Sequence, residues 1–260
     1  MHELRLVLIA LQFLTRVPVP RAVGYEPAWL NQSARHFPAV GLLVGLVAAG
    51  VLWGALRLWP MPVAVGLSMA ATLWLTGAFH EDGLADTLDA LGGSADREHA
   101  LQIMKDSRIG AYGAIGLVVV LGLKAAALVS MAPWIALPAL LLMHAASRGC
   151  ATLVMKALRY AGDAAHAKAK PLVQQVSTAT AAVALGWVVL TAVAIGAADA
   201  LPMRAIATAL VAAALAALAC AAWLQRRLGG YTGDGLGATQ QFAELAGLLG
   251  VSAACSYLPS

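Results

Sequence analysis

Long runs of apolar residues dominate this sequence of 260 residues. A helix that crosses the hydrocarbon core of a bilayer needs about 20 mostly apolar residues. Runs of this kind cover residues 38–59, 61–79, 111–130, 134–150, 177–197, 202–223 and, less strongly, 243–258. Only 12% of the residues are charged and 61% are hydrophobic, which excludes a soluble globular domain, a disordered chain and a collagen-like chain. The sequence therefore predicts an all-α, polytopic helical membrane protein with about six to seven transmembrane helices in the lipid bilayer.

The first 16 residues have a different, amphipathic pattern. On a helix, three polar side chains share one face and three leucines cover another: Arg5, Gln12 and Arg16 against Leu4, Leu8 and Leu11. No small-residue cleavage site follows, which disfavours a signal peptide. We therefore predict an N-terminal amphipathic helix that lies at the membrane interface.

Most of the 17 basic residues gather in alternate connections between the predicted spans. They lie before the first span, at 80–110, at 148–176 and at 226–227. Cytoplasmic loops of membrane proteins carry an excess of Lys and Arg. We therefore expect these segments on the cytoplasmic side of the membrane and the short turns between the other spans on the opposite side.

The chain contains no long linker and no low-complexity segment. It is therefore predicted to form a single integral membrane domain over residues 1–260, with cytoplasmic site loops at 77–113 and 226–245. The net charge of +4 is small, and we expect no nucleic-acid partner.

An acidic segment follows the second predicted span and reads His80-Glu-Asp-Gly-Leu-Ala-Asp-Thr-Leu-Asp89. Asp82, Asp86 and Asp89 are spaced i, i+4, i+7, which on a helix places them within an arc of about 60°. Mg²⁺ typically takes one or two carboxylates together with substrate phosphates. The spacing therefore indicates a metal site, with Glu81 as a further candidate ligand. A plain acidic face at the membrane interface is the alternative, and His80 could be a ligand, a general base or an ordinary interface histidine.

The segment Met104–Gly113 brings cations and glycines to the start of the third predicted span. Lys105 and Arg108 supply positive charge, and Asp106 and Ser107 lie between them. This composition is typical of a phosphate-binding segment. A positive-inside anchor explains the same cations equally well if the neighbouring carboxylates are left aside.

A third polar segment, Gly229–Ala238, is similar to part of the acidic one. Aligned without gaps on Gly77–Asp86, it repeats a glycine, an aromatic residue and Asp-Gly-Leu, so that Asp234 matches Asp82. Chance and a decayed internal repeat both explain so short a match. Asp234 would add a carboxylate on the cytoplasmic side. Carboxylates, cations and flexible glycines are together what phosphoryl-type transfer requires.

The three segments together resemble the cobalamin synthase family. The matching stretches are His80–Asp89, Met104–Gly113, Gly230–Ala238 and, more weakly, Leu14–Pro20 and Phe37–Gly45. They follow the order of the family and run from residue 14 to residue 245, so the resemblance covers nearly the whole chain. The central motifs are long and rare elsewhere, which makes the match specific.

The resemblance implies a transferase in the bacterial inner membrane that joins adenosylcobinamide-GDP to α-ribazole, or to its 5′-phosphate, and releases GMP. It implies Mg²⁺ as cofactor, held by Asp82, Asp86 and Asp89. The hydroxyl proton would go to His80, Asp82 or Asp86. The substrate-binding residues would be Lys105, Asp106, Ser107, Arg108, Arg148, Thr232 and Asp234. A homo-oligomer or an association with other cobalamin-assembly enzymes is a further expectation.

Two other classes compete with this interpretation: a membrane transporter and a membrane phosphotransferase of the CDP-alcohol type. Polar residues at span ends also mark ion pathways. Against a transporter, the predicted spans contain almost no ionisable residue, and Lys124 alone lies clearly mid-span. Release of GMP would distinguish the transferase from a transporter.

Overall fold

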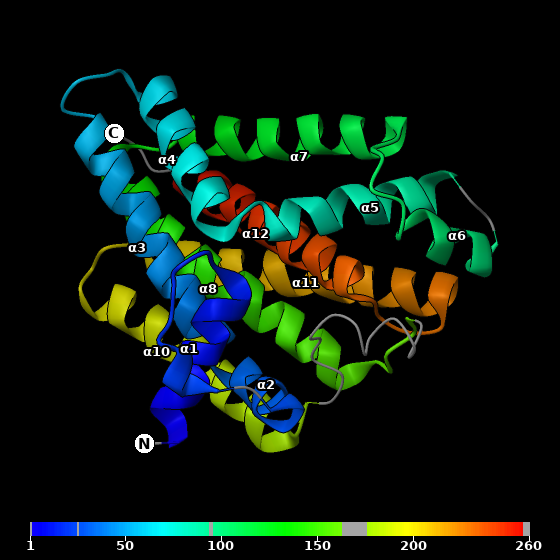
Figure 1. Ribbon diagram of the computed structural model, residues 1–260. Helices are drawn as coiled ribbons and strands as arrows, with labels where there is room; N and C mark the ends of the chain where they lie inside the picture. The colour runs from blue at the N-terminus through cyan, green and yellow to red at the C-terminus, as the bar shows by residue number, and fades with distance from the viewer. Residues whose placement is uncertain (1, 25, 94–95, 163–175, 257–260) are drawn as a thin grey trace.

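The computed structural model describes residues 2–24, 26–93, 96–162 and 176–256 (Figure 1). Among these residues the regular elements are all helices, joined by turns and short connections, and one isolated parallel bridge links Tyr160 and Tyr231. The elements are α1 (His2–Leu14), η1 (Arg21–Val23), α2 (Pro27–Ser33), η2 (Ala34–His36), α3 (Phe37–Ala55), α4 (Met61–Thr76), α5 (Phe79–Gly93), α6 (Arg97–Ile103), α7 (Ala111–Val129), α8 (Pro133–Ala157), α10 (Thr178–Ala197), α11 (Met203–Leu228) and α12 (Gly233–Ser256). The predicted all-α class is confirmed.

Five helical stretches of the described residues are long and apolar enough to cross a membrane. They are Pro27–Ala55, which joins α2, η2 and α3, and the single helices α7, α8, α10 and α11. α4 and α5 pass the same test only as a pair, so the number rises to six if that bent pair is one span. The hydropathy pattern therefore located most of the spans.

The predicted span 61–79 ends earlier than its hydropathy indicated. α4 stops at Thr76, and α5 starts at Phe79 after a bend of 88°. The break is formed by two residues in the left-handed region, Gly77 at φ 67° and Ala78 at φ 56°. A side chain at Gly77 would also meet the guanidinium of Arg16, so the bend brings the N-terminal segment against the start of α5.

The predicted seventh span, 243–258, belongs to a longer helix, and its last two residues lie outside the described part of the chain. α12 begins ten residues earlier, at Gly233, and its first half carries buried polar side chains. It packs against α5, α7, α8 and α11 (Figure 1). α12 is not among the apolar candidate spans, because it mixes polar and apolar residues. Neighbouring helices nevertheless bury about half of its residues.

α1 is the N-terminal helix that the sequence predicted. It buries a stripe of apolar side chains against the rest of the molecule: Leu6, Ile9, Ala10 and Leu14. Leu4 remains 65% exposed, so the leucine face is only partly covered by protein. An exposed leucine on such a helix fits an interfacial position, which stays a prediction.

Candidate active site

The acidic segment forms α5, as its spacing predicted, and the helix ends at Gly93. Its first turn follows directly on the bend at Gly77 and Ala78. Asp82 is exposed, whereas Asp86 and Asp89 are half-buried. The three aspartates therefore lie along one helix, in environments that become more enclosed toward the loop before α7.

Asp89 contacts the start of α7. The backbone N–H of Gly110 donates a hydrogen bond to its Oδ2 atom (2.7 Å), and that of Gly113 donates one to its Oδ1 atom (2.8 Å). The first N–H groups of a helix have no partner inside the helix, and a negative charge is favourable there. Both carboxylate oxygens of Asp89 are thus engaged in capping α7, a role that the sequence interpretation of Asp89 as a metal ligand did not foresee.

The absence of side chains at two glycines of the basic segment leaves room for this contact. A Cβ atom at Gly110 or at Gly113 would collide with the carboxylate of Asp89. The composition of this segment predicted a bound phosphate, but in the structure the anion that approaches its glycines is the side chain of Asp89.

We expect Gly113→Ala to lower the stability of the protein by about 1–3 kcal/mol, because overpacking a close contact costs this much. Asp89 would have to withdraw from the start of α7. Thermal unfolding of the purified protein in detergent measures the loss. Gly122→Ala is the matched control on the same helix, because a Cβ atom at Gly122 meets no other atom within 4 Å. Equal unfolding temperatures for the two variants would contradict the packing argument.

The third polar segment meets the first where α12 crosses α5. A Cβ atom at Gly83 would lie 2.9 Å from the carbonyl oxygen of Asp234, and one at Gly237 would lie 3.0 Å from that of His80. Two glycines therefore allow the two backbones to touch. The two similar segments also share a backbone conformation at their start, because Gly77 and Gly229 each follow the end of a helix and adopt left-handed φ and ψ angles.

Thr232 and Asp234 occupy the start of α12. Thr232 is buried, and its hydroxyl oxygen accepts a hydrogen bond from the N–H of Gly235 (3.0 Å), as an N-cap residue does. Asp234 lies in the first turn, where the helix dipole favours a carboxylate. The hydroxyl of Thr232 therefore caps α12. Asp234 lies against the first turns of α5, next to Gly83.

The basic segment lies in the connection between α6 and α7. Arg108 is 87% exposed and forms an ion pair with Asp106, which also accepts a hydrogen bond from the Arg108 backbone N–H (3.1 Å). The hydrogen bonds from Arg108 lower the pKa of the Asp106 carboxyl to about 2. Asp106 is thus ionised at neutral pH and holds the guanidinium at the surface beside the exposed residues Lys105 and Ser107.

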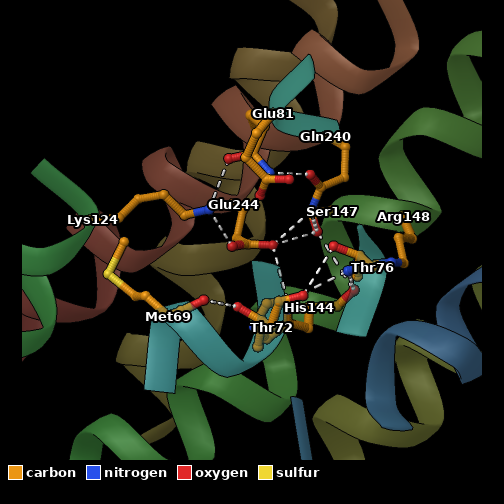
Figure 2. Close-up of polar contacts among 11 residues, drawn as sticks. Met69, Thr72, Thr76, Glu81, Lys124, His144, Ser147, Arg148, Gln240 and Glu244 are labelled. Carbon is orange, nitrogen blue, oxygen red and sulfur yellow. Dashed lines mark hydrogen bonds and ion pairs between the residues drawn. The ribbon is translucent and has the colours of Figure 1, made fainter. Parts of the chain in front are cut away.

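A buried polar cluster lies inside the bundle, and the sequence interpretation missed it (Figure 2). Lys124 of α7 pairs with Glu244 of α12 at 2.5 Å, and His144 of α8 lies 3.1 Å from the other oxygen of Glu244. Gln240 donates to that same oxygen (2.6 Å). The spans are therefore not poor in ionisable groups. Two features of the sequence could have indicated the cluster: Lys124 lies in the middle of a predicted span, and α12 carries several polar residues. Their partners lie about 100 or more positions away in the chain, so the sequence did not connect them.

Glu81 points into this cluster, although the next residue, Asp82, is exposed. Its Oε1 atom accepts a hydrogen bond from the amide of Gln241 (2.8 Å), which in turn accepts one from Lys124 (2.9 Å). Its Oε2 atom is buried with no hydrogen-bond partner among the described residues. Glu81 therefore connects the start of α5 to the interior and lies apart from the exposed edge that Asp82 occupies.

His80 and Arg148 are both buried and line the same two cavities. One cavity also contains the side chains of Glu81, Lys124 and Glu244. Arg148 donates from Nη1 to the carbonyl oxygen of His144 (2.9 Å), while its Nε atom has no hydrogen-bond partner among the described residues. Arg148 is thus placed beside His80, inside the bundle, rather than in the loop that follows α8.

The donor set at the edge of α5 suits Mg²⁺. Among the described residues, no group of three His, Cys, Asp or Glu side chains is close enough to hold a metal ion without other ligands. Mg²⁺ does not require such a group, because it keeps several waters and uses one or two carboxylates with substrate phosphates. Asp82 and Asp86 are one helical turn apart on α5, and Asp234 lies at the crossing with α12. These oxygens are the hard ligands that Mg²⁺ prefers.

Comparison with known proteins gives one consistent result. Residues 6–252 match the family model of cobalamin-5-phosphate synthase. A protein of Leptothrix cholodnii named adenosylcobinamide-GDP ribazoletransferase is 59% identical over 96% of this chain and 95% of its own length. A protein of Ralstonia nicotianae with the same name is 46% identical over 91% of this chain and 90% of its own length. Another, of Albidiferax ferrireducens, is 42% identical over 96% of this chain and 98% of its own length. No solved structure matches the chain. The resemblance inferred from the motifs is confirmed: the chain belongs to the cobalamin-5-phosphate synthase family.

Proposed function

We propose that this chain catalyses the final joining step of cobalamin synthesis, in which adenosylcobinamide-GDP and α-ribazole, or its 5′-phosphate, combine with release of GMP. The observation that carries the proposal is the identity of 59% over nearly the full chain with a relative named for this activity. The motifs on α5, before α7 and on α12 lie within the matched region.

The reaction is a substitution at phosphorus. A hydroxyl oxygen of α-ribazole forms a bond to the phosphorus on the cobinamide side, the bond from that phosphorus to the bridging oxygen breaks, and GMP leaves with the bonding electrons. The proton of the hydroxyl goes to a base. His80, which is buried beside Arg148, and the carboxylates of Asp82 and Asp86 are the candidate acceptors.

Mg²⁺ is the proposed cofactor, held by Asp82 and Asp86 of α5 with Asp234 of α12 close by. When bound there it would polarise the pyrophosphate and offset its negative charge. Asp89 remains on the same helix face, with its oxygens occupied by the α7 backbone. Lys105 and Arg108 would interact with the phosphate of the departing GMP, because cations stabilise charge on the leaving group.

The buried cluster of Lys124, His144 and Glu244 is the observation that would favour a transporter, because charged residues inside a membrane often mark ion pathways. The cluster is internally paired, however, and the relatives carry the name of a transferase. The family match also favours this activity over a CDP-alcohol type phosphotransferase.

We further propose that the protein lies in the bacterial inner membrane with the active site on the cytoplasmic side. The basic segments support this orientation. Association with a second copy or with other cobalamin-assembly enzymes stays a prediction.

A reporter fused after Arg97 is expected to give a cytoplasmic signal, and one fused after Asp199 a periplasmic signal. Arg97 lies at the start of α6 beside the site, whereas Asp199 lies in the turn between α10 and α11. Alkaline phosphatase and green fluorescent protein fusions measure the two sides. A periplasmic signal from Arg97 would overturn the proposed orientation, because the nucleotide-linked substrate is cytosolic.

The direct test of the proposed function is release of GMP by the detergent-solubilised protein. The reaction needs adenosylcobinamide-GDP, α-ribazole and Mg²⁺. GMP and the joined corrinoid should appear in equal amounts. Absence of product with both substrates saturating would refute the proposal, and so would GMP release that does not depend on α-ribazole.

A further inference from the structure

A second cavity lies beside the polar one, where α1, α3, α5, α8 and α12 meet. Its empty space, including its open mouth, is about 500 Å³. Its lining side chains are apolar apart from His80 and Arg148. The cavity therefore presents an apolar chamber with two polar groups on its wall.

Three phenylalanines from separate helices form the aromatic part of this chamber. The rings of Phe13 and Phe37 are stacked, with centroids 5.6 Å apart and planes 11° apart. Phe79 meets Phe13 edge-on at 5.4 Å and remains 43% exposed. Parallel and edge-on ring surfaces of this kind are suited to bind another flat ring.

The chamber adjoins both acidic segments. Phe79 and His80 begin α5, two to three residues before Asp82, and Gly233 precedes Asp234 at the start of α12. A ring held here would place the sugar attached to it next to the carboxylates proposed to hold Mg²⁺. The chamber is therefore within reach of the proposed reaction, although none of the proposed metal ligands lines it.

The chemistry of the lining discriminates between two flat rings that are each joined to a reacting group through a ribose, the guanine of the GDP moiety and the benzimidazole of ribazole. Guanine presents several donors and acceptors, and burying them without partners would cost free energy for each group. The benzimidazole ring of ribazole has no exocyclic polar group and only one ring nitrogen free to accept a hydrogen bond. The Nε–H of Arg148 is a buried donor without a partner among the described residues. An apolar wall with so few polar groups matches the benzimidazole better than the guanine.

We infer that the chamber formed by Phe13, Phe37, Phe79 and Arg148 binds the benzimidazole base of α-ribazole. The inference rests on the proposed function for the identity of the ligand. The base lies against the phenylalanine rings, and the ribose hydroxyl that attacks phosphorus extends toward the start of α5.

Phe79→Ala tests the inference, because this ring is partly exposed and its loss leaves the core phenylalanine pair in place. The dissociation constant of α-ribazole is measured through benzimidazole fluorescence in EDTA, which prevents turnover, with and without saturating adenosylcobinamide-GDP. We expect it to rise about tenfold, within the range that loss of one stacking ring causes. In the GMP assay the KM for α-ribazole should rise, while the KM for adenosylcobinamide-GDP and kcat stay close to wild type.

Phe79→Tyr keeps the ring and should restore binding, and Phe242→Ala is the matched control. Phe242 is a partly buried phenylalanine of α12 that lines a different groove, so its loss should leave the dissociation constant unchanged. An unchanged constant for Phe79→Ala, or no α-ribazole binding by the wild type, would overturn the inference. A selective loss of adenosylcobinamide-GDP binding would do the same. Binding that follows this pattern without GMP release would leave the chamber assigned and refute the proposed function alone.

Discussion

Asp82→Asn is expected to reduce GMP release by about a hundredfold or more without lowering the unfolding temperature. A metal ion acting as a Lewis acid contributes several kcal/mol to a transition state, and each 1.4 kcal/mol corresponds to a factor of ten in rate. Asp82 is exposed, and its side chain makes no hydrogen bond or ion pair within the described part of the chain. Its replacement by asparagine therefore breaks no side-chain hydrogen bond or ion pair of the fold.

Asp89→Asn is the informative comparison on the same helix. Asp89 accepts one hydrogen bond on each oxygen from the start of α7, and an asparagine can accept on only one of them. We expect a loss of stability of about 0.5–2 kcal/mol, as for other helix caps. GMP release and thermal unfolding, measured for both variants across Mg²⁺ concentrations, separate the two roles. Near wild-type release by Asp82→Asn at saturating Mg²⁺ would remove Asp82 from the proposed metal site.

Much of the architecture could be predicted because it depends on local sequence. The apolar stretches that became α7, α8, α10 and α11 each satisfy the length requirement of a bilayer by themselves. The helix α5 follows from the spacing of its aspartates and from the two glycines that end it. Family membership could also be predicted, since it depends on motifs that are contiguous in the sequence.

The remaining features depend on contacts between distant segments. α4 ends at Thr76 because the next two residues, Gly77 and Ala78, adopt left-handed conformations, which hydropathy does not report. The capping role of Asp89 needs the N–H groups of Gly110 and Gly113, more than 20 positions away. Glu244 could be read from sequence only as a polar interruption of an apolar run, because its partners are on α7 and α8.

The same buried cluster provides the largest expected effect on stability. Lys124→Met should destabilise the protein by about 3–5 kcal/mol, because removing one member of a buried ion pair leaves an uncompensated charge in the interior. Lys124 and Glu244 are both less than a tenth exposed, and three neighbours (His144, Ser147 and Gln240) lie around the carboxylate of Glu244. Thermal unfolding in detergent measures the loss. Lys156→Met, at an exposed lysine near the end of α8, is the control that should leave the unfolding temperature unchanged.

The double variant Lys124→Met/Glu244→Gln decides whether the effect comes from the pair. If the cost of each single substitution is the unpaired charge that it leaves behind, the double variant removes that charge and should be more stable than Lys124→Met alone. The glutamine can still accept the hydrogen bond that Gln240 now donates to Glu244. Additive losses would mean instead that each side chain stabilises the bundle through separate contacts. The cluster would then be a set of independent hydrogen bonds, and Glu81, which is joined to it through Gln241, would keep its position at the start of α5 without Lys124.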